Sequence, residues 1–328
     1  MISESAIIKA LSTESGGFIG DDAAILPVLY EEQYVITKDL LVEDIHFRTH
    51  YFAPNDLAHK ALHVNLSDLS AMGARPLYVL CGIAIPSNLE QYAYDVLEHL
   101  SSCCKEANVM LVGGDTTASS DKLFISITAI GAVSKVGMKR RSSAQTEDLI
   151  CVAGHLGWAH LGLMVLEKRQ NTDTKKSVGI FTKFTEASLR PNAKTKEGIW
   201  LSKEVCVTSM MDISDGLYVD LQRLSRASEA GAVIELDALE YSSEFEDACK
   251  ICHIEPLTAQ LVGGEDYGLL FTVSPDSFDS ISQRFKDTFG YGIRRIGRIT
   301  KGSLVTMTQN NEDINLNIKP FTHFGEKI

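Results

Sequence analysis

Residues 54–73 read PNDLAHKALHVNLSDLSAMG, and this stretch predicts a helix with one apolar side. Pro54 suits a first helical turn, where its missing N–H needs no partner, and Gly73 suits the end of the helix. The apolar residues recur at the spacing of one helix face: Leu57, Ala58, Ala61 and Leu62. We therefore expect a helix over residues 54–72 with an apolar face to bury.

Strands and helices alternate on both sides of this helix, which predicts an α/β or α+β fold. The expected strands are residues 33–37, 77–85, 109–112, 123–133, 149–153, 207–211, 267–273 and 293–299. The other expected helices are residues 3–11, 89–107, 156–168 and 216–227. The polar segment 134–148 separates two such series and predicts two domains, an N-terminal one over 1–138 and a C-terminal one over 139–328.

The composition of the chain limits its class and its partners. Its 328 residues are 45% hydrophobic and 23% charged, which is typical of a folded protein with two domains. The net charge of −12 and the lack of a basic stripe argue against nucleic acid as a main partner. We expect no signal peptide, no membrane helix and, because the seven cysteines form no framework, a reducing cytoplasm.

Carboxylates recur beside glycines or where expected strands end. They fall in Gly20-Asp21-Asp22, Thr37-Lys38-Asp39, Asn65-Leu66-Ser67-Asp68, Gly113-Gly114-Asp115, Asp212-Ile213-Ser214-Asp215-Gly216 and Gly263-Gly264-Glu265-Asp266. Strands that end together bring such side chains to one sheet edge, and their oxygens suit Mg²⁺ rather than zinc. Any one of these motifs is more simply a turn or a helix cap. Six of them favour a metal-dependent α/β protein that handles phosphates.

Electrostatics supports the metal. Two like charges about 4 Å apart repel by roughly 4 kcal/mol at an effective dielectric constant near 20. Aspartates that face a polyphosphate therefore need divalent ions between them. Arg141 is the candidate for a direct cation on phosphate, with a solvated linker charge as the alternative. The chain has neither a Walker loop nor a dinucleotide fingerprint, so the phosphate cradle must be of another kind.

Two shorter patterns point to other chemistry and are set aside. Residues 249–253 read CKICH, which matches a haem-attachment pattern, but that chemistry needs an exported protein. His59 and His63 lie four apart on the expected helix and could form a metal pair, but no third ligand is near in sequence. A polar helix face is the simpler interpretation.

Five motifs appear in a fixed order: Gly20-Asp21-Asp22-Ala23-Ala24, Asn65-Leu66-Ser67-Asp68-Leu69-Ser70-Ala71-Met72-Gly73-Ala74, Gly113-Gly114-Asp115-Thr116-Thr117, Asp212-Ile213-Ser214-Asp215-Gly216-Leu217 and Gly263-Gly264-Glu265-Asp266-Tyr267. Together they resemble the thiamine-monophosphate kinase family, part of the aminoimidazole-ribonucleotide-synthetase-like ATP-binding superfamily. The resemblance runs from about Gly20 to His323, nearly the whole chain.

The resemblance implies an N-terminal α/β domain whose strands form a barrel-like dimer interface, and a C-terminal α/β domain folded over a nucleotide. It implies that ATP and thiamine monophosphate give thiamine diphosphate and ADP. It also implies a cytoplasmic homodimer that uses several Mg²⁺ ions, and it leaves a monovalent cation open. The acceptor is an ionised phosphate oxygen, so we expect direct in-line transfer without a strong general base.

Site residues follow from the resemblance position by position. The implied metal ligands are Asp22, Thr37, Lys38, Asp39, Asp68, Asp115, Asp212 and Asp215. The implied ATP contacts are Gly114, Asp115, Arg141 and Ser214, and the implied substrate contacts are His46, Glu265 and Phe321. We expect Asp39, Asp115 and Arg141 to be the catalytic groups, Glu265 to pair with the cationic thiamine, and Phe321 to cover its ring.

This chain departs from the family pattern at three positions. Lys38 stands where the family usually has Thr, so only its backbone carbonyl can bind a metal, or its charge replaces one ion. Residues 141–144 read RSSA instead of Arg-Ser-Gly-Ala, and Phe321 replaces a Tyr or Trp. The alternatives are another synthetase of the superfamily, such as one similar to aminoimidazole ribonucleotide synthetase, and a non-catalytic nucleotide or thiamine-phosphate sensor, which Lys38 favours.

Overall fold

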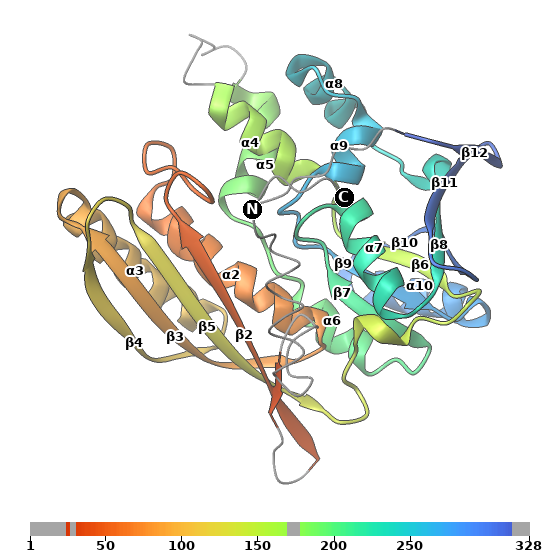
Figure 1. The fold of residues 1–328 in the computed structure, drawn as a ribbon, viewed down its shortest axis with the longest axis horizontal. Helices are drawn as coiled ribbons and strands as arrows, with labels where there is room; N and C mark the ends of the chain where they lie inside the picture. Colours follow the sequence, from red (N-terminus) through yellow and green to blue (C-terminus); the bar gives the residue numbers. More distant parts are fainter. Residues whose placement is uncertain (1–23, 27–30, 169–177, 317–328) are drawn as a thin grey trace.

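The chain is built from two sheets that lie side by side, each with its own helices (Figure 1). The computed structural model describes residues 24–26, 31–168 and 178–316. The first sheet has five strands in the order β1-β2-β5-β3-β4, and the second has seven in the order β12-β11-β8-β10-β6-β9-β7. The expected mixed α/β class is confirmed. The chain passes from one sheet to the other between Ser134 and Leu149, within the segment where the sequence predicts a domain boundary.

The first sheet is antiparallel except between β3 and β4. Its strands are β1 (Ala24–Leu26), β2 (Glu32–Val42), β3 (Arg75–Pro86), β4 (Met110–Ser119) and β5 (Phe124–Ser134). Side chains alternate between its two faces, as the pleat requires. In β2, for example, Thr37 and Leu41 are buried, whereas Lys38 and Leu40 are exposed. One face of this sheet is therefore covered and the other is open.

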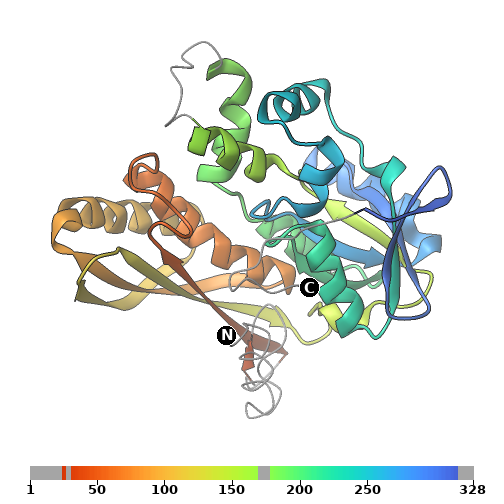
Figure 2. The ribbon, with the colours of Figure 1, turned by 45° about the horizontal axis from the view of Figure 1, so that its top comes forward.

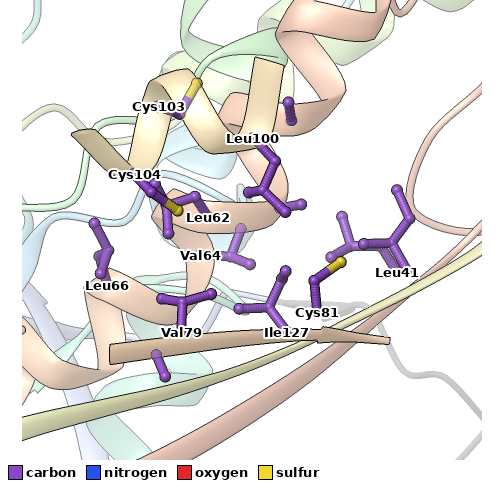
Figure 3. Close-up of a cluster of buried hydrophobic side chains, with 14 of the residues drawn as sticks. Leu41, Leu62, Val64, Leu66, Val79, Cys81, Leu100, Cys103, Cys104 and Ile127 are labelled. Carbon is purple, nitrogen blue, oxygen red and sulfur yellow. The ribbon is translucent and has the colours of Figure 1, made fainter. Parts of the chain in front are cut away.

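Two helices cover the inner face of the first sheet: α2 (Pro54–Ala71) and α3 (Glu90–Glu106). Figure 2 shows both on the same side of the strands. Figure 3 shows part of the core between them, with Leu62 and Leu66 of α2, Leu100 of α3, and Val79 and Ile127 of the sheet. The helix expected over residues 54–72 is confirmed, because its apolar stripe is what packs on the strands.

The outer face of the first sheet presents large apolar side chains to solvent. Its exposed members are Tyr34, Leu40, Tyr78, Leu80, Met110 and Val112. Leu40 is 52% exposed and Met110 is 62% exposed. Apolar side chains gathered on one open sheet face can mark an interaction surface.

The second sheet is covered on both faces. Its strands are β6 (Leu149–Ala153), β7 (Val207–Asp212), β8 (Gly231–Glu235), β9 (Leu269–Val273), β10 (Arg294–Thr300), β11 (Val305–Gln309) and β12 (Glu312–Ile314). Its helices are α4 (Trp158–Lys168), α5 (Val178–Leu189), α6 (Thr195–Ser202), α7 (Leu217–Ala227), α8 (Ser243–Cys252), α9 (Pro256–Val262) and α10 (Phe278–Phe289). α7 packs into one core cluster and α10 into another. All five residues of β9 are consequently buried, as in a strand with helices on both sides.

The two halves meet along α2, and we call this region of contact the seam. Ser67 Oγ donates a hydrogen bond to Asp212 Oδ2 at 2.7 Å, and Ser70 Oγ donates one to Thr195 Oγ1 at 3.1 Å. At Gly198 in α6, a Cβ would lie 2.2 Å from the Ser70 carbonyl oxygen. The close approach of these two helices therefore requires glycine at that position.

The structure corrects two local expectations. Residues 113–115 do not form a turn, because β4 continues through them in register with β3, and the Gly114 position has no room for a Cβ beside the Cys81 carbonyl. Residues 37–39 do not end a strand, because β2 runs on to Val42 beside β5. Pairing of β4 with β3 and of β2 with β5 extends both strands beyond the residues that the local sequence pattern predicts. The expected helix over residues 3–11 lies outside the described residues.

Among the described helices, none combines the length and the apolar character that crossing a membrane requires.

Candidate functional site

Carboxylates from both halves of the chain gather at the seam. Thr37 and Asp39 come from β2, on the face that α2 covers, and Asp68 comes from α2 itself. Asp212 is the last residue of β7, and Asp215 follows in the turn before α7. Residues far apart in sequence are thereby brought into one region.

The motif Asn65-Leu66-Ser67-Asp68 connects three elements through its polar side chains. Asn65 Oδ1 accepts a hydrogen bond from the Asp39 N–H at 3.0 Å, which ties β2 to α2. Ser67 reaches Asp212 across the seam, and Asp68 Oδ2 accepts a hydrogen bond from the Thr37 hydroxyl. Successive polar residues of α2 thus form hydrogen bonds with β2 and β7. These bonds explain why polar residues interrupt the apolar pattern of the helix.

Asp39 lies in an environment that disfavours its negative charge. Its pKa is raised to about 6, first by burial and second by the charge of Asp215. The two carboxylates belong to different halves of the chain, so their mutual repulsion acts across the seam. A cation placed between them would relieve that repulsion.

The donors at the seam are carboxylate and hydroxyl oxygens, which suit Mg²⁺. In the described part of the chain, no three His, Cys, Asp or Glu side chains lie close enough together to hold a metal by themselves. Mg²⁺ commonly binds through one or two carboxylates and completes its shell with waters and substrate phosphates. The residues present therefore fit Mg²⁺ held jointly with a bound phosphate compound.

Two residues that sequence reasoning missed hold the turn 212–216 in place. Asp220 Oδ2 accepts hydrogen bonds from the Ser214 N–H at 3.0 Å and the Asp215 N–H at 2.9 Å. Arg223 Nη1 lies 2.5 Å from Asp215 Oδ2 and 2.9 Å from Asp220 Oδ1. Burial raises the pKa of Asp220 to about 7, and the charge of Arg223 opposes that rise. The signal was present as an acid in the first turn of α7 and an arginine three residues later.

Arg141 lies next to this turn. It begins the short 3₁₀ segment Arg141–Ser143, and its carbonyl accepts a hydrogen bond from Ser228 Oγ at 2.5 Å. Its charge lowers the pKa of Asp220, which places the guanidinium within electrostatic reach of the turn that contains Ser214. Two of the implied ATP contacts thus lie in one region.

The turn that carries Glu265 packs directly on the turn 212–216. The Glu265 N–H donates to the Ser214 carbonyl at 2.7 Å, and the Tyr267 N–H donates to the Ile213 carbonyl at 2.9 Å. Glu265 has φ +64° and Tyr267 has φ +48°, both in the left-handed region. Asp266 caps α4 by accepting from Gly157 N–H at 2.6 Å. Backbone pairing therefore places the implied substrate contact beside the implied nucleotide contact.

Lys60 is the other residue that sequence reasoning missed. It is 2% exposed, and its Nζ lies 2.7 Å from Glu265 Oε1 and 3.1 Å from the His46 carbonyl oxygen. His46 Nδ1 accepts from the Val42 N–H at 3.0 Å, so a neutral His46 ring carries its proton on Nε2. The sequence carried a signal for this role: Lys60 follows Leu57 by three residues and so lies on the apolar side of the predicted helix. Lysine is rarely buried without a partner, so a partner could have been expected.

Gly114 and Asp115 are not brought to the seam within one chain. Both are exposed on β4, at the edge of the sheet. Asp39, Ile127, Cys81 and Gly114 form one row across four strands. Three strand spacings put the backbones of Asp39 and Gly114 about 14 Å apart. Asp115 therefore cannot share an ion with Asp39 in this arrangement.

Lys38 is also turned away from the carboxylates. Its side chain is exposed on the outer face, where its Nζ donates to Thr128 Oγ1 at 3.3 Å. Thr37 and Asp39 point to the opposite face, so the amine of Lys38 does not lie among them. Asp22 and Phe321 lie outside the described residues.

The two other sequence patterns have structural explanations. Cys249 and Cys252 are buried in α8, and all seven cysteines of the chain are unpaired. The rings of His59 and His63 stack at 3.9 Å and interact with backbone atoms of residues 191 and 193. Burial lowers the pKa of both histidines, to about 3 for His63. These histidines thus join α2 to the segment that follows α5.

Comparison with known proteins extends over both halves. Family models for the N-terminal and C-terminal domains of AIR synthase related protein match residues 20–133 and 146–309. Thiamine-monophosphate kinase of Bacillus subtilis is 31% identical over 93% of each chain, and that of Haemophilus influenzae is 38% identical over 82% of this chain and 78% of its own. The solved structure of AaThiL complexed with AMPPCP and TMP has a TM-score of 0.86 at 26% identity and covers 98% of this chain and 97% of its own. The similarity therefore includes the seam.

Proposed function

Because the chain belongs to the thiamine-monophosphate kinase family of AIR synthase related proteins, we propose that it transfers the γ-phosphoryl group of ATP to thiamine monophosphate. The products are thiamine diphosphate and ADP. The observation that carries this proposal is the meeting of Asp39 and Asp215 across the seam, next to the implied contacts for both substrates. The relative AaThiL, complexed with AMPPCP and TMP, supports the same pair of ligands.

The residues of this chain that would hold Mg²⁺ are Asp22, Thr37, Asp39, Asp68, Asp115, Asp212 and Asp215, with the backbone carbonyl of Lys38. When bound, Mg²⁺ would supply positive charge against the β- and γ-phosphates of ATP. The raised pKa of Asp39 supports this role, because a site that repels a second negative charge favours a cation.

We propose direct in-line transfer. The second pKa of a phosphate monoester is about 6, so the acceptor oxygen of thiamine monophosphate is ionised near neutral pH and needs no general base. The chain must instead bring two anions together and hold them in line. We propose that Arg141 offsets charge that develops on the transferred group; its charge already acts on Asp220, which holds the turn with Ser214. A chemically competent phosphoprotein trapped by rapid quench would contradict this mechanism.

The substrate side of the site is formed by His46 and Glu265. With Nδ1 occupied by the Val42 N–H, the Nε2–H of His46 can donate to a substrate phosphate. Glu265 is 28% exposed and can face the cationic thiamine moiety. We propose that Phe321 covers the same ring, as the resemblance implies.

We further propose a homodimer that pairs the outer faces of two first sheets. Leu40 and Met110 are more than half exposed there, and burial of such a face would be favourable at about 25 cal/mol per Å². Light scattering on a Leu40→Asp variant tests this, because a charge on this apolar face should give a monomer. A wild-type monomer at micromolar concentration would contradict it. The seven unpaired thiols fit the proposed cytoplasmic location.

A coupled assay of ADP release tests the function. ATP and Mg²⁺ are offered with thiamine monophosphate, thiamine or formylglycinamidine ribonucleotide. ADP release that depends on thiamine monophosphate and stops with excess EDTA supports the proposal. Turnover with the ribonucleotide alone would support a synthetase, and ATP binding without any turnover would support a sensor.

A further inference from the structure

Lys60 is a buried cation that connects the two expected substrate contacts. Its ammonium group pairs with the carboxylate of Glu265 from the C-terminal half and donates to the carbonyl of His46 from the N-terminal half. Its Nζ also lies 5.3 Å from the centroid of the Phe52 ring. One side chain therefore links α2, the loop after β2 and the turn 263–267.

The cost of burying an ammonium group makes this arrangement informative. A lysine that is 2% exposed loses nearly all of its hydration, and only paired charges and hydrogen bonds offset that loss. Phe52 and the backbone of α2 could be packed equally well by an apolar residue. The charge of Lys60 is therefore needed for its contacts with Glu265 and the His46 carbonyl, and not for packing.

Glu265 is held at both ends. Its backbone N–H donates to the Ser214 carbonyl, and its side-chain Oε1 accepts from Lys60. Its backbone has φ +64°, in the left-handed region, so the turn that carries it has a specific conformation. The path from His46 through Lys60 and Glu265 to Ser214 thus connects the implied thiamine phosphate contacts to an implied ATP contact.

We propose that Lys60 is a positioning residue that sets the affinity for thiamine monophosphate by holding Glu265 and the His46 loop at their working separation. This inference rests on the proposed function and goes beyond it, because it assigns specificity to a side chain that itself does not touch the substrate. It predicts that loss of Lys60 changes the KM for thiamine monophosphate far more than the KM for ATP.

Lys139 provides a matched control. It is also buried, at 7% exposed, but its Nζ donates only to backbone carbonyls of Glu204 and Val207, at 2.9 and 2.7 Å, among the contacts of the described residues. Lys60→Met and Lys139→Met each remove one buried ammonium group and keep the shape of the chain. Both should lower the midpoint of thermal unfolding, but only Lys60→Met should affect the substrate.

The first experiment is steady-state kinetics on the two variants. We expect Lys60→Met to raise the KM for thiamine monophosphate about 10- to 100-fold, the range of a lost charge-assisted contact, and to change the KM for ATP less than about threefold. An unchanged or lower KM for thiamine monophosphate would overturn the proposal, as would an equal rise in Lys139→Met. If Lys60→Met does not fold, Lys60→Gln is measured with the same expectations.

The second experiment tests whether Lys60 acts through Glu265. If it does, Lys60→Met should raise the KM by a smaller factor in a Glu265→Gln background than in the wild type, because the charge pair is already lost and only the contact with the His46 carbonyl remains to be removed. Independent effects that multiply would overturn the proposal. A wild type without turnover of thiamine monophosphate would count against the proposed function, whereas a normal wild type with an unaffected Lys60→Met would count against Lys60 alone.

Discussion

The seam and the exposed middle of β4 carry parts of the same implied site, and they differ in burial and in hydrogen bonding. At the seam, Asp39 is half-buried with a raised pKa, and Asp212 is buried and accepts a hydrogen bond from Ser67. On β4, Gly114 and Asp115 are exposed, and the carboxylate of Asp115 accepts from the next backbone N–H, that of Thr116, at 2.9 Å. The fold organises the first region before any ligand binds. In the second region, the hydrogen bond of the Asp115 carboxylate stays within β4.

Substitutions at the seam and on β4 should differ in how they affect stability and activity. A residue whose hydrogen bonds cross the seam contributes to both, because the same contacts that position it hold two halves of the chain together. An exposed side chain on an edge strand contributes little to stability, whatever its role in turnover. Changes in the two regions should therefore have different signatures.

The largest expected effect is that of Asp115→Asn. We expect turnover to fall by two or more orders of magnitude, because a ligand for a divalent ion is lost, while the unfolding midpoint hardly changes. Steady-state kinetics and thermal unfolding on the same sample check both parts. Near-normal activity of this variant would contradict the proposal that Asp115 on β4 is part of the active site.

Ser67→Ala should show the opposite signature. The change removes the donor to Asp212 at 2.7 Å and leaves a buried carboxylate short of a partner. We expect a loss of about 1–3 kcal/mol in the free energy of unfolding together with reduced turnover. Denaturant titration gives the first quantity. Ser102→Ala, at an exposed position on α3 away from the seam, is the control and should change neither.

Acid should weaken the seam through His63. Burial and the nearby charge of His59 lower its pKa to about 3, whereas in the unfolded chain it returns to about 6.5. Between these values only the unfolded chain binds the proton, so this contribution to stability is present above pH 6.5 and is lost as the pH falls, at up to about 1.4 kcal/mol per pH unit.

Burial raises the pKa values of Asp220 and Asp266 to about 7, so these two groups stabilise the folded chain as the pH falls and oppose the effect of His63. The effect of His63 is therefore measured as the difference in stability between the wild type and a His63 variant. Wild type should lose stability relative to His63→Asn as the pH is lowered from 6.5 to 4.5. The same substitution at the exposed His99 should leave the profile of the wild type unchanged. Parallel profiles for wild type and His63→Asn would contradict the assignment.

The smallest expected effect is that of Lys38→Ala. Its side chain lies on the outer face, away from Asp39, and its backbone carbonyl is unaffected by the change. We expect turnover and its dependence on Mg²⁺ concentration to stay within about threefold of wild type. A large shift in the Mg²⁺ dependence would show that the amine does substitute for an ion.

Much of the fold and the family could be predicted from the sequence because the signals are local. The helix over residues 54–72 and the strand over 149–153 follow from periodicity, and the five motifs identify the family. Strand alternation could also have placed Lys38 opposite Thr37 and Asp39. Whether β4 would continue through Gly114 could not be predicted, because it depends on pairing with β3.

The contacts across the seam were not predictable in the same way. Ser67 and Asp212 are 145 residues apart, and nothing local links Lys60 to Glu265. Asp220 and Arg223 were visible as a charged pair on a helix, but their role appears only when the turn 212–216 folds back on them. Long-range partners of polar residues are what a single sequence conceals most.

Gly198 has a consequence for how the two halves can move. Its backbone rests on the Ser70 carbonyl so closely that even a methyl group would act as a wedge. Lys60 lies on α2, ten residues before Ser70 and about 15 Å from it along the helix axis. If one half rotates on the other about this contact, displacement grows with distance from it, so the region of Lys60 moves more than the region of Ser70.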